Sequence, residues 1–113
     1  MIPRLQLGDF EIHFLTDGDF KLDGGAMFGI VPKPLWTRER PCDERNRMTL
    51  SCNNPLIRTG KDNILIDCGL GRKWNDKQRD IYDINARPLL LEQLAEVGLQ
   101  PKDITILIHT HLH

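Results

Sequence analysis

Three histidines at every second position, His109, His111 and His113, are the strongest candidates for chemistry in this sequence. They follow the apolar, β-branched run 104–108, which is typical of a buried strand. Because side chains alternate across a strand, the three imidazoles would start on one side of it. Imidazole is the commonest protein ligand for zinc and similar metals. The spacing therefore predicts that part of a metal site lies where this strand opens into a loop.

A carboxylate and two glycines, Asp67, Gly69 and Gly71, form a second candidate feature. Asp67 directly follows the apolar run 64–66, and glycine permits backbone angles that other residues resist. A carboxylate in such a place can orient a metal-binding imidazole and tune its basicity. Asp-x-Gly is also a common turn, so Asp67 gains weight only together with the histidines. Catalytic zinc commonly has three protein ligands and a water, so these residues make at most part of a site.

The strands that must position these residues can be read from hydrophobic alternation and turn residues. Residues 4–7 and 10–15 predict a β-hairpin around Gly8-Asp9. The stretch Asp17-Gly18-Asp19 predicts a second turn, in which the aspartates bond to nearby backbone rather than to a metal. Residues 56–66 predict another hairpin.

One helix is expected over residues 88–97, where Pro88 suits the first turn, an apolar stripe supplies a buried face and Gly98 suits the end. This helix precedes the histidine strand 104–108. The order strand, helix, strand favours a helix packed on a sheet. The polar stretch 72–85 is expected to be irregular and to be anchored by its two aromatic side chains.

The long segment 23–47 shows little periodicity and contains three prolines, so we expect an irregular loop. Met27, Phe28 and Trp36 argue against full disorder, because disordered segments carry few such residues. Two interpretations stay open. The loop forms a lid or rim over a pocket, with these three residues as the substrate-loop candidates, or it packs on a neighbouring subunit.

Composition narrows the classes of function. The chain has 113 residues, within the usual size of one domain, and a formal net charge of −1, which gives no general attraction to nucleic acid or anionic membranes. No apolar run approaches the roughly 18 residues of a membrane-spanning helix, and the first residues lack the pattern of a signal peptide. Three cysteines without a CxxC pair indicate reduced thiols. We therefore expect a cytoplasmic protein that binds neither nucleic acid nor membranes.

The segment Thr110-His111-Leu112-His113 resembles the opening of the HxHxDH motif of the metallo-β-lactamase superfamily. In that register His111 and His113 are the first two metal ligands. A competing register starts at His109 and places His113 where the motif has aspartate. Asp67-Cys68-Gly69 is similar to the family's Asp-Thr-Gly, apart from Cys68. Four further stretches resemble one subgroup, the quorum-quenching N-acyl-homoserine lactonase-like hydrolases of the YtnP type: residues 25–36, 43–47, 56–60 and 65–71.

This resemblance implies a metal-dependent hydrolase in which a metal-bound hydroxide attacks the carbonyl of a small-molecule ester or lactone. The family holds two ions, commonly zinc, although another divalent metal would also suit imidazole ligands. Carried over by position, His111 and His113 would bind one ion, while Asp67 and His109 would support them without being ligands. No catalytic residue apart from metal ligands is implied for this chain.

The implied fold is α/β (α+β): the N-terminal half of an αβ/βα sandwich, with a mostly antiparallel or mixed sheet and one packed helix. Residues 1–113 would then be the N-terminal portion of a single metallo-β-lactamase-like domain that ends within the motif. Its partner would be the missing C-terminal half or a second subunit, and the isolated chain would be inactive. The alternative is a non-catalytic binding or assembly module that pairs with a complementary fragment or with itself and binds metal structurally. In a third interpretation the histidines are plain strand-end residues.

Overall fold

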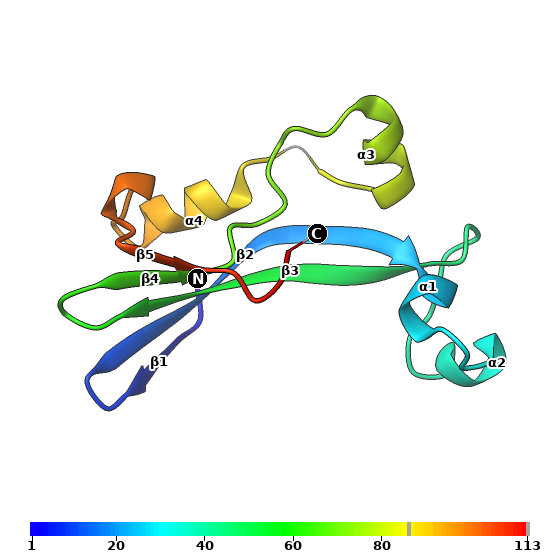
Figure 1. Cartoon of the computed structure of the whole chain (residues 1–113), viewed down its shortest axis with the longest axis horizontal. Coiled ribbons are helices and arrows are strands. Elements are labelled where there is room, and N and C mark those ends of the chain that lie inside the picture. Colours follow the sequence, from blue (N-terminus) through cyan, green and yellow to red (C-terminus); the bar gives the residue numbers. More distant parts are fainter. Residues whose placement is uncertain (86, 113) are drawn as a thin grey trace. The chain divides into compact units, whose positions relative to one another are not determined.

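The computed structural model describes residues 1–85 and 87–112, so the prediction for His113 falls outside the described residues. Pairs of strands and pairs of short helices follow one another along the chain, as the colours of Figure 1 show. In chain order they are β1 (Arg4–Leu7), β2 (Phe10–Asp23), α1 (Gly24–Phe28), α2 (Lys33–Trp36), β3 (Arg47–Arg58), β4 (Asn63–Ile66), α3 (Asp76–Tyr82), α4 (Leu89–Glu96), the 3-10 turn η1 (Pro101–Asp103) and β5 (Ile106–Ile108).

The five strands form one mixed sheet in the order β1-β2-β3-β4-β5. β1 and β2 pair antiparallel across the turn at Gly8, whose φ of 59° suits a glycine, and β3 pairs antiparallel with β4. β5 runs parallel to β4, with Ile66 opposite Ile108. The predicted hairpins and the predicted mixed α/β architecture are therefore confirmed.

The turn predicted at Asp17-Gly18-Asp19 is wrong, because β2 continues through these residues to Asp23. Gly18 adopts its positive φ of 94° within the strand. Contacts along the strand hold this stretch: the Thr16 hydroxyl donates to the Cys52 carbonyl at 3.0 Å, and the Ser51 hydroxyl donates to Asp19 at 2.7 Å. Local turn preference is weak compared with pairing along a sheet, so the strand continues.

The chain divides into two compact units, and unit 1 comprises residues 1–18, 52–72 and the described residues from 87 to 112. Its core is a cluster of leucines from the strands, α4 and the turn after it: Leu15, Leu56, Leu65, Leu90, Leu94 and Leu99. The predicted helix 88–97 is confirmed as α4, with Gly98 at φ 80° just after it. α4 covers the strands with Leu90 and Leu94, four residues apart on one face.

The prediction that the histidine strand is buried is wrong. Ile106, Leu107 and Ile108 of β5 are 40–46% exposed. β5 is the last strand in the sheet order, and β4 is its hydrogen-bonded neighbour. An apolar strand with this exposure is one that further polypeptide would normally cover.

Unit 2 comprises residues 19–51 and 73–85, and its first part departs from the irregular loop predicted for 23–47. α1 is capped by Asp23, which accepts from the Ala26 amide at 3.1 Å, and α2 follows Pro32. Trp36 is buried and stacks on Phe28 with ring centroids 5.1 Å apart. A Cβ on Gly24 would lie 2.7 Å from Cζ2 of the Trp36 indole and still closer to Cη2, so only glycine fits beneath this ring.

The stretch 72–85 of the sequence is also more regular than predicted, since it contains α3. Asn75 accepts from the Gln78 amide while the Gln78 side chain accepts from the Asn75 amide, a reciprocal capping box. The predicted aromatic anchor is confirmed, with Trp74 and Tyr82 in edge contact at 5.9 Å. Within the described residues, no helix is long and apolar enough to cross a bilayer.

Candidate metal centre

Two loops meet at one edge of the sheet in unit 1. β4 and β5 are parallel neighbours, so the loops that follow them, 67–71 and 109–112, leave from the same edge (Figure 1). The Asp67 amide donates to the Ile108 carbonyl at 2.7 Å, which fixes the start of one loop against the start of the other. The structure thereby brings the predicted residues Asp67, His109 and His111 together.

The contact between the loops is a two-point hydrogen bond from Thr110 to Asp67. The Thr110 amide donates to Oδ1 at 2.9 Å, and its hydroxyl donates to Oδ2 at 2.7 Å. The hydroxyl, followed by the amide, lowers the pKa of the Asp67 carboxyl below its ordinary value. Asp67 is therefore an ionised acceptor near neutral pH. The backbone of Asp67 itself lies in the left-handed region, at a φ of 56°.

The same threonine fixes the proton on His111. Thr110 Oγ1 lies 2.8 Å from His111 Nδ1. A hydroxyl has one proton, and Thr110 gives it to ionised Asp67, so His111 Nδ1 must be the donor in the second contact. We assign the Nδ1–H tautomer to neutral His111 on this count. The lone pair then lies on Nε2, an atom through which neutral imidazole binds metals.

His109 takes a looser position beside the same carboxylate. Its Nδ1 lies 3.8 Å from Asp67 Oδ1, beyond hydrogen-bonding distance, and its side chain is 43% exposed. The contact is an ion pair only when the imidazole is protonated. Its predicted supporting role stays a prediction.

A second carboxylate, Asp17 of β2, holds the loop 67–71 from the other side. Its Oδ2 accepts from the amides of Leu70 at 2.7 Å and Gly71 at 3.2 Å, and its Oδ1 accepts from the Leu90 amide in α4 at 3.0 Å. A Cβ on Gly69 would lie 2.8 Å from Asp17 Cγ, so the loop can approach this closely only with glycine there. The sequence interpretation missed this role, because the turn pattern at Asp17 explained the residue locally.

The loop has a third support in Asn54, a fully buried residue of β3. In the amide orientation that satisfies its surroundings, Asn54 donates to the Cys52 carbonyl at 3.2 Å and accepts from the Gly69 amide at 3.1 Å. Burial raises the pKa of the adjacent Cys52 thiol to about 11, so this cysteine is protonated near neutral pH. An asparagine in a strand pattern carries no sequence signal for such a role.

The remaining predicted residues belong to unit 2. Met27 is 45% exposed at the end of α1, whereas Trp36 is buried under its stack with Phe28. Among the described residues, no three histidine, cysteine or acidic side chains gather closely enough to hold a metal ion. The described part of the chain thus contains one oriented imidazole with its supports, and a complete site needs further ligands.

Comparison with known proteins identifies relatives of the whole described fold. The sequence model of the metallo-beta-lactamase superfamily matches residues 48–113. A solved probable metal-dependent hydrolase from Staphylococcus aureus is 40% identical, with a TM-score of 0.89, over 96% of this chain and 40% of that chain. The hydrolase AbOPH, described as a member of the beta lactamase superfamily, is 25% identical, with a TM-score of 0.72, over 99% of this chain and 36% of its own.

A third solved structure, the dizinc quorum-quenching lactonase AidC, has a TM-score of 0.69 over 99% of this chain and 36% of its own. At 22% identity it shows a shared fold. The chain thus spans about two fifths of the length of the structures that it matches. No curated protein matched the sequence.

Proposed function

Because the chain belongs to the metallo-beta-lactamase superfamily, we propose that it carries part of the metal centre of a hydrolase that cleaves small-molecule esters or lactones. The observation that carries the proposal is the hydrogen-bonded series Asp67–Thr110–His111. It joins the two loops at the sheet edge and sets the tautomer of an imidazole, which is how proteins prepare a metal ligand.

We assign His111 and His113 as ligands of one divalent ion, with zinc as the first choice. Neutral imidazole suits zinc, and the Nδ1–H tautomer of His111 places a lone pair on the other ring nitrogen, so the donor chemistry fits. His113 lies outside the described residues, and the described residues contain no group of three potential metal ligands. When bound, the metal supplies Lewis acidity and lowers the pKa of a coordinated water to about 7.

The residues of this chain orient and support that centre. Asp67 holds Thr110 through both carboxylate oxygens, and Thr110 in turn keeps the Nδ1 proton on His111. His109, whose Nδ1 lies 3.8 Å from Asp67 Oδ1, adds a second imidazole beside the same carboxylate. None of these groups attacks the substrate.

The lactone as substrate is proposed from the likeness to a lactonase and from the subgroup pattern in the sequence. In unit 2, Met27 is the exposed candidate for substrate contact. Phe28 and Trp36 would act by keeping α1 and α2 in shape, because their rings are stacked on each other.

We also propose that residues 1–113 are the N-terminal portion of one domain and are inactive in isolation. The exposure of β5, and of Leu7 and Phe14 in the first hairpin, supports this, since these apolar side chains would be covered by further polypeptide. That cover is the C-terminal half of the same domain or a second subunit.

Metal content and lactone hydrolysis, measured on one preparation of the protein at its full natural length, test the proposal. His111→Ala should lose at least one ion per chain and reduce kcat/KM by about 1,000-fold or more, since a missing ligand disables the ion. His13→Gln is the matched control, because His13 contacts Glu11 and lies outside both loops. Full metal content and normal hydrolysis in His111→Ala would contradict the proposal.

A further inference from the structure

Asp17 makes an unusual set of contacts for a strand residue outside the histidine loop. One carboxylate accepts three backbone hydrogen bonds, two from Leu70 and Gly71 and one from Leu90. The donors lie 53 to 73 residues further along the chain and belong to two separate segments. The neighbouring Thr16 amide donates to Gln93 of α4 at 2.8 Å, so this point of β2 holds both segments at once.

α4 depends on this carboxylate because it has no cap of its own. Pro88 occupies the N-cap position and makes no side-chain hydrogen bond to the helix. The first amides of a helix lack partners within it and favour a negative charge. Asp17 Oδ1 gives the Leu90 amide a hydrogen-bond acceptor and places a negative charge at the start of α4.

The loop 67–71 depends on Asp17 because its backbone is held in unusual angles. Asp67, Gly69 and Gly71 all have positive φ, of 56°, 78° and 71°. Among residues other than glycine, aspartate and asparagine adopt this region most readily, but it is still uncommon, and local contacts help to hold Asp67 there. Asp17 holds the Leu70–Gly71 end of this loop, and Thr110 accounts for the other end.

We propose that Asp17 is a positioning residue for the metal centre. It fixes the amides of Leu70 and Gly71, and the loop then holds Asp67 in the angle from which it binds Thr110 and so orients His111. The inference rests on the proposed function for the metal, and it adds a residue of β2 that acts through the backbone of the loop 67–71.

Zinc affinity by chelator competition, on the metal-stripped protein at its full natural length, tests this role. Asp17→Asn keeps the shape of the side chain but replaces one acceptor oxygen with an amide that faces backbone donors. We expect zinc affinity to fall about 10- to 100-fold, as for other groups that orient a ligand. In zinc-saturated protein kcat should fall while KM stays within about twofold, since the metal centre is displaced and the substrate contacts are not.

Asp19→Asn is the matched control, because Asp19 lies on the same strand, is exposed and accepts from Ser51. Its zinc affinity should equal that of the wild type. A purely structural Asp17 would lower the melting temperature of the zinc-free protein and leave the shift produced by zinc unchanged. That result, or normal zinc affinity in Asp17→Asn, would overturn the inference.

A second pair of variants keeps the test informative if Asp17→Asn fails to fold. Gly71→Ala disturbs the loop through its φ of 71°, and Gly98→Ala makes the same kind of change after α4 at φ 80°; an added Cβ meets nothing within 4 Å at either site. Gly71→Ala alone should weaken zinc binding, and equal affinities in the two would overturn the inference. A wild-type protein that takes up no zinc would instead overturn the proposed function itself.

Discussion

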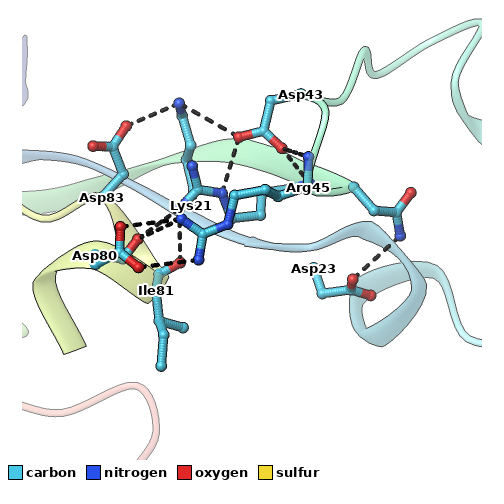
Figure 2. A network of polar contacts seen from close by, with 9 residues as sticks. Lys21, Asp23, Asp43, Arg45, Asp80, Ile81 and Asp83 are labelled. Atoms are coloured by element: carbon cyan, nitrogen blue, oxygen red, sulfur yellow. Dashed lines mark hydrogen bonds and ion pairs between the residues drawn. The ribbon is translucent and has the colours of Figure 1, made fainter. Parts of the chain in front are cut away.

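In unit 2 the carboxylates of Asp43, Asp80 and Asp83 are paired with cations, whereas Asp17 and Asp67 near the candidate metal centre in unit 1 are held by neutral donors. Figure 2 shows the first kind: Lys21 lies 3.7 Å from Asp43 and 2.8 Å from Asp83, and Arg45 reaches Asp80 at 3.1 Å. Asp17 and Asp67, in contrast, accept from backbone amides and one hydroxyl.

The unit 2 network joins the segment before β3 to α3. Arg47 contacts Asp43 through Nε at 2.9 Å and the carbonyls of Asp80 and Ile81 at 2.7 and 3.0 Å. Its charge thus serves two purposes, an ion pair and the capture of carbonyls near the end of a helix. The cations Lys21, Arg45 and Arg47 are thus matched by the carboxylates of Asp43, Asp80 and Asp83.

Neutral donors have a different consequence. They stabilise a carboxylate without cancelling its charge, so Asp67 leaves negative charge beside the histidine loop. A cation at that loop is therefore favoured electrostatically. We infer that charge pairing distinguishes Asp43, Asp80 and Asp83, which hold the network of unit 2, from Asp17 and Asp67, which we propose prepare a site in unit 1.

The largest expected effect is a loss of stability when the packing of unit 2 is disrupted. Trp36→Ala removes a buried ring and should lower the free energy of unfolding by about 3–5 kcal/mol, the usual range for a buried aromatic residue. Zinc affinity should stay within about twofold, because the ring belongs to unit 2. Chemical denaturation and zinc competition on the same samples measure both.

Met27→Ala is the companion variant, because Met27 belongs to the same short helices but is exposed. It should leave the free energy of unfolding nearly unchanged and raise KM a few-fold if Met27 contacts substrate. A large loss of zinc affinity in Trp36→Ala would show that metal binding in unit 1 depends on the packing of unit 2.

The next largest expected effect is a loss of zinc affinity when one contact in unit 1 is removed. Thr110→Val keeps the size of the side chain and removes the hydroxyl between Asp67 and His111, so zinc affinity should fall about 10- to 100-fold. Thr105→Val is matched to it, since the Thr105 hydroxyl also donates to an aspartate, Asp62, but before β5. Isothermal titration with zinc compares them, and equal affinities would refute the role of Thr110.

Part of the fold and of the candidate site was predictable from the sequence. The alternating histidines, the Asp67 turn and the α4 stripe are local patterns, and local patterns survive folding when tertiary contacts agree with them. The predicted burial of β5 failed because burial depends on what covers a strand, which its own residues do not encode.

The role of Asp17 was not predictable, because its partners lie more than fifty residues away and are backbone amides, which have no sequence signature. α3 was not predicted, although Asn75 and Gln78 form the pattern of a capping box. Most of its residues are polar, so the sequence shows no apolar repeat of helical period. The ion pairs of unit 2 were also not predicted, because most of their partners lie far apart in the sequence. Lys21, Arg47 and Asp83 come together only in the folded chain.

The smallest expected effect is the loss of stability at low pH when the Asp43 carboxylate becomes protonated. Backbone and side-chain hydrogen bonds from Arg47 lower the pKa of Asp43 to about 2 in the folded protein. A carboxylate whose folded pKa is depressed contributes stability that is fully present above its unfolded pKa, about 3.9, and is lost as the pH falls through about 2. Carbon NMR of the Asp43 carboxyl should therefore show a midpoint near 2, and Arg47→Met should move it up toward the unfolded value.

A midpoint near 4 in the unaltered protein would mean that the pairing in Figure 2 does not persist in solution. With the midpoint near 2, Asp43 stays ionised at every pH above about 4. Any change of zinc affinity between pH 5 and 8 then has to arise outside Asp43 and its partners. A zinc titration over that range in Arg47→Met and wild-type protein should give parallel curves, because the contacts of Asp43 do not change protonation there.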